Sequence, residues 1–145
     1  MKPLLPPDVE FHNDVRLLIH RPRGVINREA VNKIITVIGE LEFTSKEPFN
    51  RFLDTTGAED VDLNSEYIRR VSLYRRHFYG NRPTIKTAIL AAHPMMVNHG
   101  ELHAKLTKGS PINVRVFEDR RQAAEWLGVP VRLLTEERIG KREDT

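Results

Sequence analysis

Apolar and polar positions repeat with regular periods along most of the chain, and these periods predict five strands and about four helices. Two alternating stretches, residues 9–12 and 15–20, are typical of half-buried strands. The two-residue polar connection Asn13-Asp14 between them predicts a hairpin. Further strands are predicted over residues 49–54, 84–92 and 112–117, of which 84–92 is apolar enough for a central strand covered on both sides.

Between these strands, apolar residues recur at helical spacing. Asn27 is a predicted N-cap for a helix to about Leu41, whose apolar residues share one arc: Ala30, Val31, Ile34, Ile35, Val37, Ile38 and Leu41. Other helices are predicted over residues 63–79, from Pro94 to Gly109, and after Asp119. The helix over 63–79 has a predicted buried arc: Tyr67, Ile68, Val71, Tyr74 and Phe78.

The order of these elements predicts an α/β fold with a mixed five-stranded sheet. An initial β-hairpin supplies an antiparallel edge, and the later strands, which alternate with helices, are joined by parallel crossovers. Residues 58–62 are interpreted as a polar loop. We expect one domain over 1–145, with its core at about 8–131 and a charged, flexible tail over 132–145.

The composition narrows the class of protein. Of 145 residues, 39% are hydrophobic and 30% charged, which is typical of a globular chain. The absence of cysteine excludes disulfides, thiolate metal sites and cysteine nucleophiles, and favours a reducing compartment. We find no secretory signal and no apolar run long enough to span a membrane, so a cytoplasmic location is predicted.

Several segments together resemble the SpoIIAA-like proteins, relatives of the STAS domain of sporulation anti-sigma-factor antagonists. The matching segments are residues 52–57 (Phe-Leu-Asp-Thr-Thr-Gly), 109–114, and 114–119 running into 123–128. The resemblance covers about residues 9–129 and rests on the order and spacing of the segments. These proteins also share structural likeness with the lipid-binding CRAL-TRIO (Sec14-like) fold.

The resemblance implies a non-catalytic role in protein interaction or ligand binding. In the anti-sigma antagonists, a serine at the start of the helix after the third strand is phosphorylated, and the matching position here is Ser65, after Asn64. This chain departs from the usual Asp-Ser-Ser-Gly, because Asn64 replaces the first serine and Glu66 replaces glycine. A phosphate at Ser65 would be favoured by the helix dipole, whereas the plainer interpretation is that these residues cap the helix.

Two further groups have a functional and a structural interpretation. Asp54, Thr55, Thr56 and Gly57 follow the carboxyl end of a strand, where open α/β sheets bind ligands. They also suit a simple turn in which Gly57 takes a positive φ. His99 and His103 have the i, i+4 spacing of metal ligands, although a histidine bonded to a carbonyl group explains them more simply.

A basic helix face completes the candidate sites, and its members are Arg69, Arg70, Leu73, Arg76 and His77. Our first hypothesis is a non-catalytic module that binds a protein partner through this face together with the region Asp54–Ser65. It uses no cofactor and no specific nucleic acid. The second is a carrier or sensor of a small apolar or amphipathic, lipid-like ligand, with a pocket lined by Phe52, Tyr67, Tyr74 and Met95. The third is a histidine-metal enzyme. An edge strand such as residues 9–12 could pair with the same strand of a second copy, so a homodimer is one of the possible assemblies.

Overall fold

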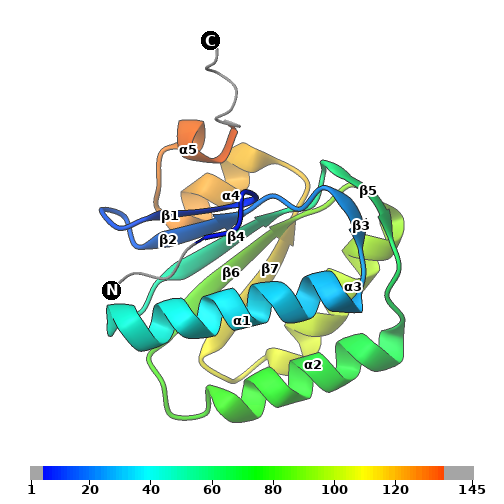
Figure 1. Cartoon of the computed structure of the whole chain (residues 1–145), viewed down its shortest axis with the longest axis horizontal. Helices are drawn as coiled ribbons and strands as arrows, with labels where there is room; N and C mark the ends of the chain where they lie inside the picture. The colour runs from blue at the N-terminus through cyan, green and yellow to red at the C-terminus, as the bar shows by residue number, and fades with distance from the viewer. Residues whose placement is uncertain (1–4, 136–145) are drawn as a thin grey trace.

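The structure, a computed structural model, describes residues 5–135, and its centre is a five-stranded sheet (Figure 1). The strands lie in the order β1 (Val9–His12), β2 (Leu17–His20), β4 (Asn50–Asp54), β6 (Ile85–Leu90) and β7 (Ile112–Phe117). β1 is antiparallel to β2, and every other neighbouring pair is parallel. The predicted mixed sheet is confirmed.

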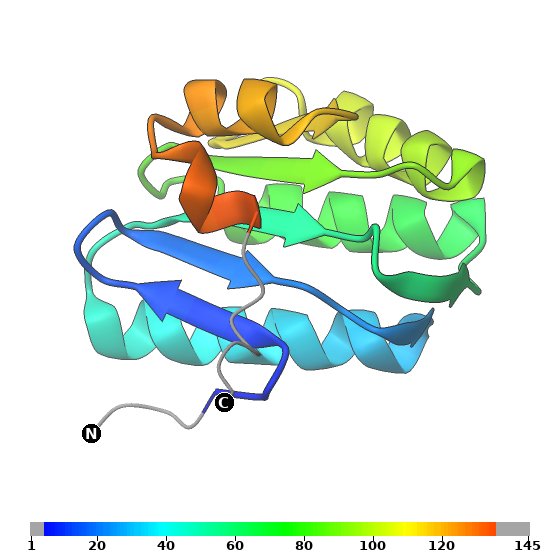
Figure 2. The ribbon, with the colours of Figure 1, turned by 90° about the horizontal axis from the view of Figure 1, so that it is seen from above.

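Helices cover both faces of this sheet. One face carries α1 (Arg28–Ser45), α2 (Ser65–Phe78) and α3 (Pro94–Thr107), and the other carries α4 (Arg120–Leu127) and α5 (Val131–Thr135) (Figures 1 and 2). Five helices are therefore present among the described residues, one more than predicted. None of the described helices has both the length and the apolar character needed to cross a membrane.

The helices begin where short polar side chains satisfy free backbone N–H groups. The Asn27 side chain accepts a hydrogen bond from the Ala30 N–H at 2.9 Å, which fixes the start of α1. Asn64 does the same for α2, and Asp119 for α4. At the end of α4, Gly128 adopts φ 76°, the left-handed conformation that glycine allows.

Several predicted boundaries are wrong. The hairpin connection is a four-residue turn over 13–16, and Arg16 has φ 49°. α1 continues past Leu41 to Ser45. Residues 58–62 are not simply a loop: β5 (Ala58–Val61) pairs in parallel with β3 (Gly24–Ile26) in a separate two-stranded sheet.

The core also differs from the predicted one at two places. Tyr74 and Phe78 are 58% and 43% exposed, because their side of α2 faces away from the sheet. The core does not end at 131: α5 forms, and Leu134 is fully buried against the α4 side of the sheet. The remainder of the predicted tail, 136–145, lies outside the described residues.

Alternate residues of the central strands enter two different cores. Leu17, Ile19 and Leu90 pack against α4 and α5 and are at most 1% exposed. Their sequence neighbour Leu18 points to the other side and packs against α1. The side of the sheet covered by α1, α2 and α3 also receives several polar side chains, and it holds the candidate site.

Candidate ligand cavity

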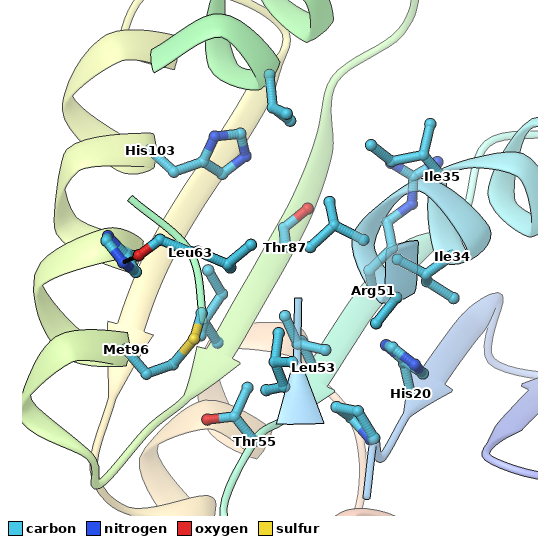
Figure 3. Close-up of a pocket in the computed structure, with 18 of the residues that line it drawn as sticks. His20, Ile34, Ile35, Arg51, Leu53, Thr55, Leu63, Thr87, Met96 and His103 are labelled. Atoms are coloured by element: carbon cyan, nitrogen blue, oxygen red, sulfur yellow. Dashed lines mark hydrogen bonds between the residues drawn. The ribbon is translucent and has the colours of Figure 1, made fainter. Parts of the chain in front are cut away.

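A cavity of about 130 Å³ lies between the sheet and the three helices α1, α2 and α3 (Figure 3). Most of its lining is aliphatic. Ile34 and Ile35 come from α1, Val71 from α2, Ile89 from β6 and Met96 from α3. An apolar cavity of about 150 Å³ is large enough to hold benzene, so this one suits a ring or a short chain.

Three polar side chains from neighbouring strands also line the cavity. His20, Arg51 and Thr87 are 7%, 3% and 6% exposed, and each has polar atoms without a hydrogen-bond partner: His20 Nδ1, Arg51 Nε and Nη1, and Thr87 Oγ1. Arg51 and Thr87 are directly paired across β4 and β6. Each unsatisfied buried group costs about 1–3 kcal/mol, so this cluster lowers the stability of the ligand-free fold.

Arg51 has a partner on one side of its guanidinium group only. Its Nη2 donates to the carboxylate of Glu42, which also accepts a hydrogen bond from the Tyr79 hydroxyl. The guanidinium carbon lies 4.6 Å from the ring centroid of Phe49. Burial raises the pKa of Tyr79, which keeps its hydroxyl neutral. Glu42 and the rings hold Arg51 in place while Nε and Nη1 stay unpaired.

His20 presents a hydrogen-bond acceptor. Its Nε2 lies 3.2 Å from Asp8 Oδ2. Burial lowers the pKa of His20 by more than Asp8 raises it, so the ring is neutral at pH 7. An ionised carboxylate only accepts hydrogen bonds, so the single ring proton belongs on Nε2 and the unpaired Nδ1 carries a lone pair.

A second pocket, of about 640 Å³, adjoins the cavity along α1. It is lined partly by exposed polar residues of α1, including Asn32 and Lys33. Four residues line both spaces: His20, Pro22, Ala30 and Ile34. These residues therefore stand between the inner cavity and the more polar pocket, where a ligand could pass.

Ser72 and His103 form a hydrogen-bonded pair beside the cavity, with Ser72 Oγ 2.7 Å from His103 Nδ1. Such a pair invites comparison with an activated serine nucleophile. Burial, and then the charge of Arg75, lower the pKa of His103 to about 3. An imidazole this weakly basic cannot serve as an efficient general base near pH 7, and Ser72 is fully buried.

The two histidines predicted as metal candidates have other partners. His99 is buried, and its Nε2 lies 2.9 Å from the Leu63 carbonyl oxygen. This contact agrees with the simpler prediction of a histidine bonded to a carbonyl group. His103 is bonded to Ser72. Within residues 5–135, no three His, Cys, Asp or Glu side chains are grouped so that they could hold a metal ion.

The predicted ligand loop is held by its own contacts. Asp54 is buried, with Oδ2 2.8 Å from Arg120 Nη2 and Oδ1 3.0 Å from the Thr56 N–H. The Thr55 hydroxyl donates to the Leu90 carbonyl at 2.7 Å. Gly57 does not have a positive φ, so the predicted reason for glycine at this position is wrong.

The start of α2 and its basic face are exposed. Asn64 is the N-cap, and Ser65 is the first residue of the helix. The residues of the basic face, Arg69, Arg70, Leu73, Arg76 and His77, are all exposed. Arg76 is held against the end of α3, because it donates to the carbonyl groups of Leu106 and Lys108.

Only part of the predicted pocket lining meets at the cavity. Phe52 borders it, although the Phe52 side chain packs in the core on the α4–α5 side. Met96 lines it next to the predicted Met95, which is 43% exposed, and Tyr67 and Tyr74 lie elsewhere. Sequence reasoning missed Arg51, although a signal was present. Helices normally cover both faces of a parallel sheet, so a charged residue inside a central strand is expected to be buried. A buried charge needs a partner, which marks such a residue as a candidate for a site.

No family model matches the chain, and no curated protein matches it. Among solved structures, it is similar to an uncharacterized protein from the DUF3478 family of Shewanella loihica PV-4, which has a SpoIIAA-like fold. The two chains are 18% identical with a TM-score of 0.53, over 82% of this chain and 90% of the other. At this identity the likeness concerns the fold alone. The chain has a SpoIIAA-like fold, as the resemblance of its sequence predicted.

Proposed function

We propose that this chain is a non-catalytic carrier or sensor of a small, mainly apolar ligand that binds between the sheet and the helices α1–α3. The observation that carries the proposal is the aliphatic cavity with unpartnered polar atoms on His20, Arg51 and Thr87. Small-molecule sites combine an apolar lining with a few convergent polar groups in this way. A ligand that used these atoms would recover hydrogen bonds that the empty fold lacks.

The proposal is tested by native mass spectrometry and by thermal unfolding with small apolar probes such as benzyl alcohol. A ligand at ten times its Kd stabilises the fold by about 1.4 kcal/mol, which raises Tm by roughly 3–6 °C. We expect this shift with the unmodified chain. No probe-dependent shift and no co-purifying mass would contradict the proposal.

A matched pair of variants places the binding inside the cavity. Val71 lines it, whereas Val25 is 44% exposed and lies on β3. Val71→Phe should fill the space and abolish the Tm shift, while Val25→Phe should leave it intact. Equal shifts in both variants would place the probe elsewhere.

A second function, binding of a protein partner, is favoured by the exposed face of α2. Leu73, Tyr74 and Phe78 are 50%, 58% and 43% exposed beside the arginines of the basic face. Exposed apolar residues among cations suit a partner with an acidic rim. Arg69→Glu with Arg70→Glu should abolish partner capture, and the control Lys33→Glu with Lys46→Glu on and beside α1 should not. Phosphorylation of Ser65, homodimerisation through β1 and a cytoplasmic location stay predictions.

A further inference from the structure

The polar lining of the cavity is not neutral, and its charge restricts the ligand. Arg51 and Arg75 both line the cavity, whereas no Asp or Glu of the described residues does so. One carboxylate, Glu42, pairs with Arg51 from outside the lining. His20 and His103 have lowered pKa values and are neutral at pH 7. The two arginines against Glu42 leave a surplus of one positive charge at their end of the cavity. The other carboxylate bonded to a lining residue, Asp8, lies beyond His20 and is partly exposed to solvent.

The unpaired donors lie at that same end. Arg51 offers free N–H groups at Nε and Nη1, and the paired residue on β6, Thr87, offers an unpartnered hydroxyl. Figure 3 shows Thr87 between Arg51 and His103. Arg51 cannot lose its proton and Nε is donor-only, so the complementary ligand atom must be an acceptor.

From this charge and these donors we infer that the ligand is a small apolar monoanion, a carboxylic acid, whose carboxylate binds Arg51 and Thr87. Its hydrocarbon part lies among Ile35, Val71 and Ile89. A cavity of about 130 Å³ limits this part to a ring or a chain of roughly six carbons. A single negative charge matches the surplus, whereas a phosphate dianion would exceed it and an ammonium group would be repelled.

This inference rests on the proposed function. Three probes of similar shape but different charge test the carboxylate inference separately from the carrier function. The probes are benzoate, benzyl alcohol and benzylamine, titrated into the full chain at pH 7 by calorimetry. We expect benzoate to bind at least tenfold more tightly than benzyl alcohol, because hydrogen bonds to charged groups contribute about 1.5–3 kcal/mol. Benzylamine should bind most weakly.

A direct readout identifies the binding group. The Arg51 Nε–H is buried and unpartnered, so its ¹⁵N-correlated NMR signal should move downfield as benzoate binds. Benzyl alcohol should move it much less. A benzoate complex in which this signal is unchanged would overturn the assigned carboxylate position.

Variants keep the test valid even if a buried charge is needed for folding. Arg51→Met with Glu42→Gln removes both members of the pair and leaves the net charge beside the cavity unchanged, because Arg75 remains. The loss of the Arg51 donors should reduce the benzoate preference about tenfold, with benzyl alcohol binding retained. Arg120→Met with Asp54→Asn removes the matching pair on the other face of β4 and should keep the preference. Thr87→Val, which removes no charge, should weaken benzoate about tenfold.

The outcomes differ for the two proposals. Benzyl alcohol or benzylamine binding as tightly as benzoate would overturn the carboxylate inference while leaving the proposed carrier function in place. Failure of all three probes, together with no co-purifying acid in the native mass spectrum, would overturn both.

Discussion

The two faces of the sheet are built from alternate residues of the same strands, yet they are built differently. On the α4–α5 face, Ile19 and Ala88 are fully buried among apolar neighbours, and the buried carboxylate of Asp54 is paired with Arg120. On the α1–α3 face, Arg51 and Thr87 enter a cavity with polar atoms unpaired. Among the described residues, the first face has one unpartnered buried polar atom, Arg120 Nε, whereas the second has four around a cavity where a ligand could supply hydrogen bonds.

The largest expected effect compares isoleucines on the two faces. Ile19→Ala deletes a fully buried side chain from the packed face and should reduce the free energy of unfolding by about 2–5 kcal/mol. Ile35→Ala only enlarges an existing cavity and should cost less than about half as much. Urea unfolding measures both. Equal losses would mean that the two faces are equally packed.

The next effect is the pH dependence contributed by the α1–α3 face. The folded chain holds His103 with a pKa of about 3, below its ordinary 6.5, so the unfolded chain binds more protons between these values. Stability is therefore complete above pH 6.5 and decreases as the pH falls. His103 alone should remove about 2 kcal/mol between pH 7 and pH 5. His20, whose pKa is also lowered, acts in the same direction.

His103→Gln tests this contribution through the slope of unfolding free energy against pH. The slope between pH 7 and pH 5 should become shallower, while His77→Gln, an exposed position on α2, should leave it unchanged. An unaltered slope in His103→Gln would show that the imidazole is not protected from protonation in the folded chain.

The smallest effect is a gain. Thr87→Val replaces an unpartnered buried hydroxyl with a methyl group and should raise the stability of the ligand-free chain by about 1 kcal/mol. Thr55→Val is the control, because its hydroxyl donates to Leu90, and its loss should lower stability by about 1 kcal/mol. If Thr87→Val is as destabilising as Thr55→Val, the Thr87 hydroxyl has a partner and the contrast between the faces is weaker.

The sequence predicted the fold better than the site. The α1 pattern and the alternation in β7 depend on local periodicity, and the helix and the strand that they predict begin where expected. The β3–β5 pairing was missed because it joins two short segments, one of them the polar Ala58–Val61, over a long separation. Leu134 was missed because α5 is only five residues long.

The cavity could not be read from periodicity for a different reason. Alternation shows that Arg51 and Phe52 face opposite sides of β4, but it does not show what covers each side. Arg51 would be an ordinary surface residue on an uncovered sheet, and it becomes a buried, half-paired cation only because α1 and α2 lie over it. Likewise, helical spacing placed Tyr74 in the core, although the neighbouring helix leaves that flank open.

The small β3–β5 sheet has a consequence for motion. β3 leads into α1 and β5 leads into α2, so their pairing ties the beginnings of the two helices together. The Tyr67 hydroxyl donates to Asn32 at 2.9 Å near these beginnings, and the Tyr79 hydroxyl donates to Glu42 near the far ends. These links join α1 and α2 at both ends, and α2 also packs along α3. Amide hydrogen exchange in α1 and α2 should slow in parallel when the space beneath them is occupied.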